Sequence, residues 1–378
     1  MKEYLDFNAT TPVAQETADL MHEYLVTEYG NAGSRSHDTG SRAKKAVLKA
    51  RQQIASICNA DVSEIIFTSG ATESNNLALL GLLEYANQNK KNHIVSTAVE
   101  HKAVLDPLEH LQKYGFKITY VQPSSSGHVT PDSVMSAITN KTFLVSCMHA
   151  NNETGAINNI DEMADRIKDL DAKIFFHSDC AQTFAKTNLN FYNPNIDMIS
   201  FSSHKFHGPK GVGGLVARKA DGISLPLKPI MFGGGQERGL RPGTLPVHLI
   251  VGMGHAAELS FINNKQWMLD CFKIKQTALK EFDNSNYVIY GTTDDATLPN
   301  TLSISFNSHA EAVIICLKEI AEIATGSACT SESYSPSHVL TAMGLNEEHA
   351  KKVVRISWGP NTNSSIFKKI NDAIMVLN

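Results

Sequence analysis

The chain has 378 residues, which is enough for two packed domains or one large domain with a sizeable hydrophobic core. Hydrophobic residues make up 42% of the sequence and charged residues 19%, a composition that excludes a disordered protein. The formal net charge of −4 excludes a strongly basic protein that coats nucleic acid.

The amino-terminal residues carry acidic side chains and lack the apolar core of a secretory signal. No stretch approaches the roughly 18 apolar residues of a membrane span, so we expect a cytoplasmic protein. The six cysteines are scattered without a C-x-x-C pair, and the sequence therefore predicts neither a metal site nor a disulfide framework.

Short runs of β-branched and aromatic residues alternate with helical patterns in the first part of the chain. We predict strands at 65–68, 93–97, 117–121, 142–148, 173–177, 198–202 and 214–217. Helical spacing is found at 73–87, 103–114 and 161–170. Several of the strands are apolar on both faces, which predicts an α/β domain with a mainly parallel sheet covered by helices.

The last third of the chain has a different pattern. A long helical stretch at about 250–282 is followed by strands at 287–290, 302–306 and 353–358 and by a helical run at 310–320. We therefore predict a large domain at 15–255 and a smaller α+β domain made of 1–14 and 256–378. Small residues and serines at 325–337 predict a mobile loop.

The segment 199–214 runs from a buried strand into a polar, Gly-rich turn that carries His204 and Lys205. Ligands of open α/β sheets bind outside the carboxyl ends of the strands, where Lys205 is expected to lie. Lys205 is then either a solvated loop residue or an amine of lowered pKa that can form an imine. Asp179, which follows the strand at 173–177, puts a carboxylate at the same edge.

These features together predict a site for pyridoxal phosphate, which needs a Schiff-base lysine, an acidic partner for its pyridine nitrogen and a phosphate cradle. The cradle is expected where the strand at 65–68 leads through Gly70, Ala71 and Thr72 into a helix, whose first turn offers N–H groups to an anion. Taken alone, these three residues are more typical of an ordinary helix cap.

Eight segments in chain order carry a resemblance to a known family. They are YLDFNATTP at 4–12, GNAGSRSH at 30–37, SGATES at 69–74, EHKAV at 100–104, NNETG at 151–155, SSHK at 202–205, RPGT at 241–244 and GSACTS at 326–331. The chain resembles the cysteine desulfurases of the NifS and IscS kind, within the fold-type I aminotransferases. This resemblance implies a seven-stranded sheet in the large domain, pyridoxal 5'-phosphate as cofactor and a homodimer.

The resemblance also implies how the cofactor is held. Lys205 would form the Schiff base and later move the α-proton of the substrate. Asp179 would pair with the pyridine nitrogen, Gln182 would hydrogen-bond the phenolic oxygen, and His101 would stack on the ring and exchange a proton with the substrate sulfur. The implied phosphate contacts are Gly70, Ala71, Thr72, Ser202 and His204, with Thr244 reaching in from the neighbouring subunit. Without the resemblance, His101 would be interpreted as an ordinary core histidine.

The substrate contacts implied by the resemblance are Arg355, Asn31 and Asn152. The guanidinium fork of Arg355 suits the carboxylate of an amino acid, and its alternative role is a surface salt bridge. Asn152 is expected near the ring oxygen and the substrate carboxylate, although spacing alone does not separate it from Asn151.

Cys329, in the predicted loop at 325–337, resembles the catalytic cysteine of group I desulfurases, with Thr325 in the place of a serine. Its thiolate would take sulfur from cofactor-bound L-cysteine, which leaves as L-alanine, and would pass the resulting persulfide sulfur to an acceptor protein. A flexible loop permits both positions. The alternative is an incidental loop thiol.

The sulfur acceptor is open between three pathways. The segment 235–244 and the end of the chain shortly after Trp358 resemble desulfurases of bacterial DNA phosphorothioation systems, in which partners would contact the DNA. Iron-sulfur cluster assembly and tRNA thiolation are the other two pathways. A selenocysteine lyase or aminotransferase of the same fold would keep Lys205, Asp179 and Arg355 without needing Cys329, and an inactive scaffold protein would need none of them.

Overall fold

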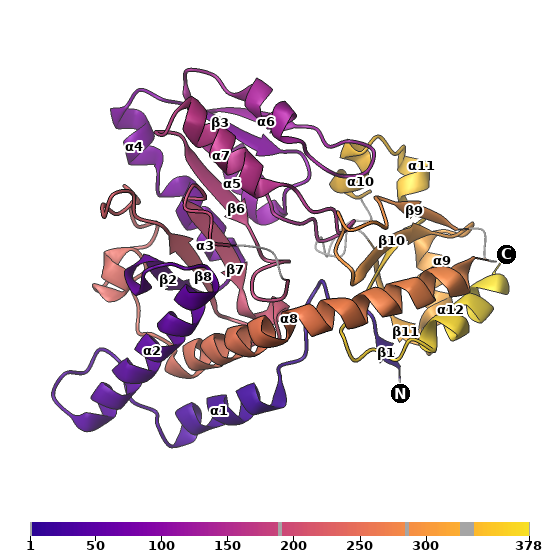
Figure 1. Cartoon of the computed structure of the whole chain (residues 1–378), viewed down its shortest axis with the longest axis horizontal. Coiled ribbons are helices and arrows are strands. Elements are labelled where there is room, and N and C mark those ends of the chain that lie inside the picture. Colours follow the sequence, from indigo (N-terminus) through magenta and orange to yellow (C-terminus); the bar gives the residue numbers. More distant parts are fainter. Residues whose placement is uncertain (1, 188–190, 284–286, 326–335, 378) are drawn as a thin grey trace.

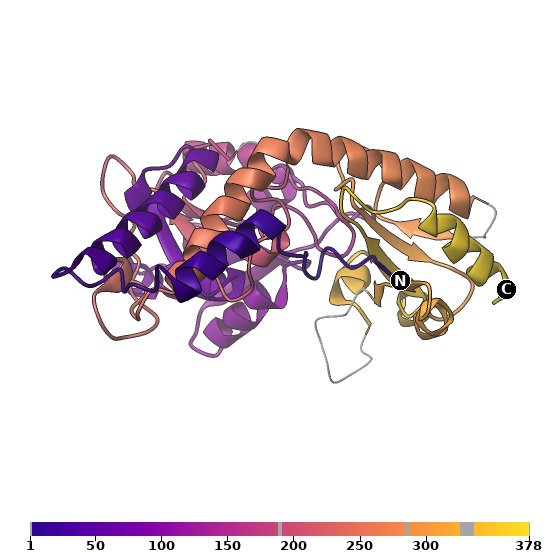
Figure 2. The ribbon, with the colours of Figure 1, turned by 90° about the horizontal axis from the view of Figure 1, so that it is seen from below.

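The computed structural model describes residues 2–187, 191–283, 287–325 and 336–377. The larger part is a layered α/β structure, and the smaller part packs a second sheet against helices (left and right in Figure 1). Helix α8 (Val247–Phe282) runs through both parts, and the second view shows the same arrangement (Figure 2).

The sheet of the larger part, as far as the structure describes the chain, has seven strands in the order β2-β8-β7-β6-β5-β3-β4. They are β2 (Ile65–Thr68), β3 (His93–Thr97), β4 (Lys117–Val121), β5 (Thr142–Ser146), β6 (Phe175–Asp179), β7 (Met198–Ser202) and β8 (Gly213–Ala217). Of these described strands, β8 alone runs antiparallel to its neighbours. The carboxyl ends of the other six therefore meet at one edge, which confirms the predicted fold class.

Side chains of the strands alternate between two hydrophobic layers, because successive residues of a strand point to opposite faces. Val95 and Val145 face one layer, and Ile94 and Leu144 face the other. The first layer is covered by α2 (Asp38–Ile57), α7 (Ile160–Leu170) and α8, and the second by α3 (Ala71–Leu80), α4 (Leu83–Gln88) and α5 (Lys102–Gln112). Helix α1 (Gln15–Val26) packs on α8, and α6 (Pro131–Ala137) packs on α7.

The smaller part contains a four-stranded antiparallel sheet in the described residues, in the order β12-β13-β10-β9. Its strands are β9 (Val288–Tyr290), β10 (Thr301–Ser305), β12 (Ala324–Thr325) and β13 (Val353–Ser357). The remaining elements are β1 (Glu3–Tyr4), which pairs with β11 (Ala321–Glu322), and the helices α9 (Ala310–Leu317), α10 (His338–Ala342), α11 (Glu347–Ala350) and α12 (Ile366–Met375). Trp358, Phe282 and Phe367 pack together in the core of this part.

The predicted domain division at residue 255 falls inside α8, which continues to Phe282. Val339 and Leu340, which the sequence assigned to the small domain, pack into the core of the larger part. The division at 255 stays a prediction.

Four strands, β2, β3, β4 and β7, have the predicted bounds, whereas β6 begins two residues later than predicted. The single helix predicted at 73–87 is wrong, because α3 ends at Leu80 and α4 begins at Leu83. Gly81 lies between them, and its carbonyl oxygen accepts a hydrogen bond of 2.9 Å from the N–H of Lys228. A Cβ at Gly81 would lie 3.0 Å from the carbonyl oxygen of Lys228, so the close approach of these two backbone segments favours glycine where the helix breaks.

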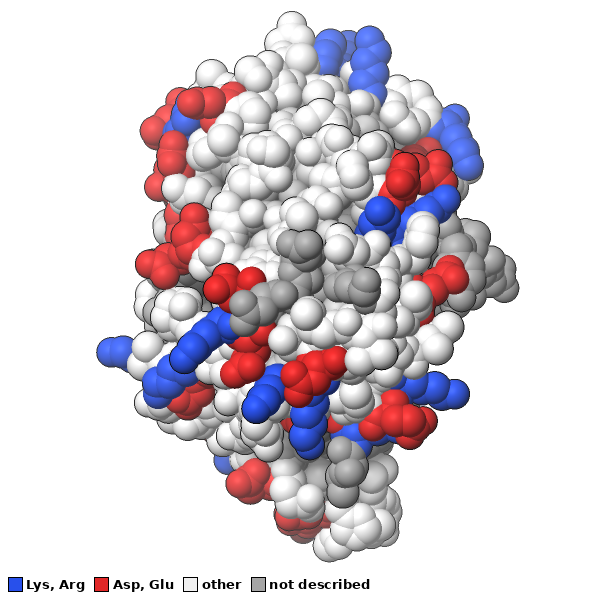
Figure 3. All heavy atoms as spheres, turned by 90° about the vertical axis from the view of Figure 1, so that its right-hand side faces the viewer, with Lys and Arg blue, Asp and Glu red and all other residues white. Residues whose placement is uncertain are grey.

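The surface at the end formed by the small sheet carries acidic and basic side chains interspersed over its lower half, whereas the middle of its upper half is largely uncharged (Figure 3). None of the helices in the described ranges is both long enough and apolar enough to cross a membrane.

Candidate active site

A cavity of about 590 Å³ lies at the carboxyl edge of the large sheet. Its wall combines the turns that follow β2, β3, β5, β6 and β7 with a side chain of β13 from the small sheet. The predicted site residues on this wall are Gly70, Ala71, Thr72, His101, Asn152, Asp179, Gln182, Ser202, His204, Lys205 and Arg355. Residues from distant segments thus meet around one space.

Lys205 follows β7 in the short helix η2 (Ser203–Lys205). Its Nζ donates hydrogen bonds to the carbonyl oxygens of Asn8 at 2.6 Å and Ala9 at 2.8 Å. The N–H of Thr11 donates to the carbonyl oxygen of His204 at 2.9 Å, which fixes the amino-terminal segment on this turn. The two carbonyl oxygens therefore hold the amine at the cavity wall.

Asp179 ends β6 and is only 5% exposed. Its Oδ2 accepts a hydrogen bond of 2.7 Å from Nδ2 of Asn75, and its Oδ1 accepts one of 2.9 Å from the N–H of Ala181. Two N–H donors thus fix the orientation of this carboxyl group at the cavity wall. Asp179 is therefore placed to pair with a protonated pyridine nitrogen.

The first turn of α3 forms one end of the cavity. N–H groups in the first turn of a helix have no acceptor within the helix, and the helix dipole adds positive potential there. The turn lies so close to β8 that a Cβ on Gly213 would come within 2.6 Å of Cα of Gly70. The N–H groups, together with the hydroxyls of Thr72 and Ser202, fit a phosphate group.

His204 lies beside this cradle, with Nδ1 at 3.1 Å from Oγ1 of Thr10. Burial, followed by the charges on Lys205 and Lys210, lowers the pKa of His204 to about 4. The imidazole is therefore neutral at pH 7, and toward an anion it would offer a hydrogen bond rather than a charge.

The polar groups of the cavity match the separate parts of pyridoxal phosphate. The amine of Lys205 suits its aldehyde, the carboxylate of Asp179 suits its pyridine nitrogen, and the first turn of α3 suits its phosphate. The donor set therefore fits the cofactor that the sequence predicts.

Two further residues on the wall have defined orientations. Nδ1 of His101 accepts a hydrogen bond of 3.0 Å from the N–H of Ala103, so a neutral ring carries its proton on Nε2. Nε2 of Gln182 donates to the carbonyl oxygen of Asn8 at 3.0 Å.

Arg355 lies in β13 and is 2% exposed, so its alternative interpretation as a surface salt bridge is wrong. Its Nη2 lies 2.5 Å from Oδ1 of Asp6, and its Nη1 donates to the carbonyl oxygen of Asn152 at 3.2 Å. Asn152 lines the cavity, whereas Oδ1 of Asn151 accepts a hydrogen bond of 2.8 Å from the N–H of Glu153. The structure thus shows that Asn152, rather than Asn151, lines the cavity, which spacing alone could not decide.

Three predicted residues are not on the wall that the described residues form. Asn31 is exposed, and its Oδ1 accepts a hydrogen bond from the N–H of Gly33. Thr244 is also exposed, in the connection between η3 (Gln236–Gly239) and α8. Cys329 lies outside the described residues. The roles assigned to all the site residues stay predictions.

Ion pairs hold the connection that carries Thr244. Nη2 of Arg51 lies 2.6 Å from Oε1 of Glu237, and Nε of Arg241 lies 2.9 Å from Oε1 of Glu73 in the first turn of α3. The connection is therefore anchored beside the phosphate cradle of its own chain.

Sequence reasoning missed the residues that hold the site residues in position. Asp6 and Asn8 lie in the matched segment 4–12 but received no role, although they are polar residues within a segment that carries the family resemblance. Asn75 lies one helical turn beyond Thr72, a spacing that puts both residues on one helix face.

Glu100 and Glu153 are buried carboxyl groups that sequence reasoning also missed. Burial raises the pKa of Glu100 to about 8, against hydrogen bonds from the N–H of Met148 and the hydroxyl of Thr97. Oε2 of Glu100 has no partner in the part of the chain that the structure describes. Burial likewise raises the pKa of Glu153 to about 7. Glu100 is therefore protonated at pH 7.

Comparisons with known proteins agree with this geometry. Residues 3–366 match the family described as Aminotransferase class-V. The chain is 42% identical to "Cysteine desulfurase IscS" of Stutzerimonas stutzeri over 360 residues, which cover 94% of this chain and 87% of the relative. A solved NifS-like protein is 34% identical with a TM-score of 0.91, covering 100% of this chain and 99% of that one. DndA from Streptomyces lividans is 44% identical with a TM-score of 0.82, covering 94% and 99%.

The raised pKa of Glu100 predicts a specific pH dependence of stability. Between pH 4.5 and about 8 the folded protein holds a proton on Glu100 that the unfolded chain has released, so stability falls as the pH rises through this window. Glu100→Gln removes this loss. We expect the unfolding free energy of the variant, relative to wild type, to rise by several kcal/mol between pH 5 and pH 9, at about 1.4 kcal/mol per pKa unit.

Denaturant unfolding at both pH values measures this difference, with Glu109→Gln as the control because Glu109 is an exposed glutamate of α5. An equal pH dependence in Glu100→Gln and wild type would contradict a protonated Glu100.

Proposed function

We infer that this chain, which belongs to the aminotransferase class-V family, is a pyridoxal-phosphate-dependent cysteine desulfurase. It uses L-cysteine and passes the sulfur to an acceptor protein. The convergence of Lys205, Asp179 and the first turn of α3 on one cavity supports the cofactor chemistry. The observation that carries the desulfurase reaction is the 42% identity to a cysteine desulfurase over 94% of this chain.

Bound pyridoxal phosphate supplies an electron sink for negative charge at the α-carbon of the amino acid. We propose that Lys205 links the cofactor to the chain and moves the proton at the α-carbon. Asp179 would keep a proton on the pyridine nitrogen, which its hydrogen bonds from Asn75 and Ala181 support. Thr72, Ser202 and His204 would bind the phosphate.

The substrate would lie between the two sheets. We propose that Arg355 binds the carboxylate of L-cysteine, and the buried position of its guanidinium supports a strong ion pair. Asn152, whose carbonyl oxygen accepts from Arg355, and Asn31 would assist it. His101, with its proton on Nε2, would exchange a proton with the substrate sulfur.

Cys329 would carry the sulfur. Its thiolate attacks the sulfur of bound cysteine, so that a sulfur–sulfur bond forms and the carbon–sulfur bond breaks. The electron pair of the broken bond goes to carbon, which takes up a proton and leaves as L-alanine. The persulfide sulfur then passes to the acceptor.

Intact mass spectrometry tests this assignment. Incubation with L-cysteine in the absence of reductant should add the mass of one or more sulfur atoms to the wild-type chain. Cys329→Ser should bind the cofactor but gain no sulfur, because it lacks the accepting thiolate. Lys205→Ala should lose the yellow colour of the bound cofactor.

An equal sulfur gain in Cys329→Ser would overturn the role of Cys329. A wild-type protein that binds the cofactor but gains no sulfur would indicate a lyase or an aminotransferase.

We further propose that the enzyme is a homodimer in which Thr244 reaches the phosphate of the neighbouring subunit. Thr244 is exposed and does not line the cavity within the described part of its own chain. Earlier in the chain, the side chain of Phe232 is 89% exposed and that of Met231 40%, and such exposed apolar side chains are typical of a surface that another subunit covers.

We propose that the enzyme acts in the cytoplasm, where thiols stay reduced.

Mixing two inactive chains tests this arrangement. A heterodimer of Lys205→Ala and Thr244→Ala chains should regain one intact site, because the Thr244→Ala chain keeps Lys205 and receives Thr244 from its partner. Cofactor loading and alanine release at limiting cofactor should therefore exceed those of either variant alone. If Thr244 served its own chain, the mixture would show only the average of the two variants.

We propose DNA phosphorothioation as the destination of the sulfur. The support is the resemblance of the segment 235–244 to the desulfurases of such systems and the 44% identity to DndA from Streptomyces lividans. The negative net charge favours a partner protein as the one that contacts DNA.

Deleting the gene should remove phosphorothioate linkages from the DNA of the host. Mass spectrometry of digested DNA measures them, and a plasmid with the wild-type gene, but not with Cys329→Ser, should restore them. Unchanged linkages together with impaired iron-sulfur enzymes or unthiolated tRNA would assign the sulfur to one of the other pathways.

A further inference from the structure

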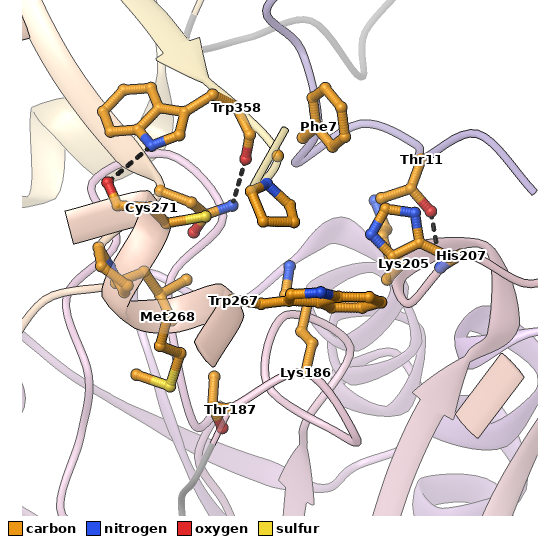
Figure 4. A pocket seen from close by; sticks show the side chains of 15 residues that line it. Phe7, Thr11, Lys186, Thr187, Lys205, His207, Trp267, Met268, Cys271 and Trp358 are labelled. Atoms are coloured by element: carbon orange, nitrogen blue, oxygen red, sulfur yellow. Dashed lines mark hydrogen bonds between the residues drawn. The ribbon is translucent and has the colours of Figure 1, made fainter. Parts of the chain in front are cut away.

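A second, smaller pocket of about 50 Å³ shares Lys205 with the large cavity. Lys186 and the aromatic side chains of Phe7, Trp267 and Trp358 also line it (Figure 4). Lys186 does not line the large cavity itself. Lys186 would therefore not touch the cofactor or the substrate, but it lies next to residues that would.

Lys186 contacts one of those residues directly. Its Nζ donates a hydrogen bond of 3.1 Å to Oε1 of Gln182, four residues earlier in the chain. Gln182 is only 3% exposed, so its side-chain oxygen has little access to water. The contact thus satisfies a polar atom that would be costly to leave unpaired.

This contact fixes which end of the Gln182 amide is the donor. A glutamine amide has an oxygen that accepts and a nitrogen that donates two hydrogen bonds. Lys186 engages the oxygen, and one N–H is used by the carbonyl oxygen of Asn8 at 3.0 Å. The second N–H is what Gln182 can offer to the cavity that it lines.

We propose that Lys186 is a positioning residue of the desulfurase, which holds the amide of Gln182 so that its nitrogen donates to the phenolic oxygen of pyridoxal phosphate. The reversed amide would present its oxygen to this electron-rich atom and weaken the cofactor interaction. This inference rests on the proposed function, because it assumes that pyridoxal phosphate occupies the cavity.

The same amide is linked to Lys205. The carbonyl oxygen of Asn8 accepts from Nε2 of Gln182 and, at 2.6 Å, from Nζ of Lys205. The Asn8 carbonyl oxygen is therefore shared by the Gln182 amide and by the amine of Lys205 before this amine is joined to the cofactor.

The role does not require a charge on Lys186. Burial, followed by the charge on Lys205, lowers the pKa of Lys186 to about 7. A neutral amine still carries two N–H groups, so it can donate to Gln182 in either protonation state.

A double-mutant cycle separates positioning from a general loss of stability. Lys186→Met keeps the length of the side chain in a pocket that is largely apolar but removes the donor. We expect it to weaken pyridoxal phosphate binding about tenfold and to shift the absorption maximum of the bound cofactor, whereas Lys186→Arg, which keeps N–H donors, restores both toward wild type. In a Gln182→Leu background, Lys186→Met should have no further effect on either measurement.

A cofactor analogue that lacks the phenolic oxygen gives a second measurement. Its dissociation constant should be the same for wild type and Lys186→Met, because the hydrogen bond at issue is absent in both. Lys168→Met is the matched control, since the amine of Lys168 lies 2.7 Å from Oδ2 of Asp197 and lines neither pocket. It should leave the affinity and the spectrum unchanged.

Each outcome decides the inference. The inference would be overturned if Lys186→Met weakened cofactor binding as much in the Gln182→Leu background as in wild type. It would also be overturned if Lys186→Met weakened binding of the analogue as much as binding of pyridoxal phosphate. A wild-type protein that binds no pyridoxal phosphate would instead contradict the proposed function.

Discussion

Two hydrogen bonds, from the N–H and the hydroxyl of Thr11 to the carbonyl oxygen of His204, hold the amino-terminal segment against the turn that carries Lys205 at the active-site cavity. The same segment pairs Asp6 with Arg355 in the small sheet. Because Lys205 follows a strand of the large sheet, the segment connects the two sheets at the cavity. It thereby sets the distance between the amine that would hold the cofactor and the guanidinium that would bind the substrate.

Most strands of the large sheet could be predicted from the sequence because they are buried on both faces, which selects runs of β-branched and aromatic residues. The buried strands β2, β3 and β7 were predicted with their observed bounds, and so was the edge strand β4, which is partly exposed. The break between α3 and α4 could not be predicted, since it depends on the approach of Lys228, far along the chain, to Gly81. The short strands β11 and β12 have two residues each, too few for any periodic pattern.

Motifs predicted the site residues, most of which line one cavity, but they did not identify the hydrogen-bond partners of those residues. Asp179 was predicted from its position after a strand, whereas Asn75, which donates to it, lies 104 positions earlier. Glu100 precedes His101 in a matched segment, yet its raised pKa results from burial that only the folded chain creates. The contacts that orient a site are long-range and leave no spacing signal in the sequence.

Helix α8 is continuous over 36 residues and packs against α2 in the larger part and α12 in the smaller one. A rotation of the smaller part against the larger part would have to bend α8, or pull α8 away from α2 or from α12. The span between Lys205 and Arg355 is therefore preset. A preset span would suit the carboxylate and α-carbon that all α-amino acids share. Discrimination in favour of cysteine would then rest on groups that meet its side chain, such as the ring of His101, which lines the same cavity.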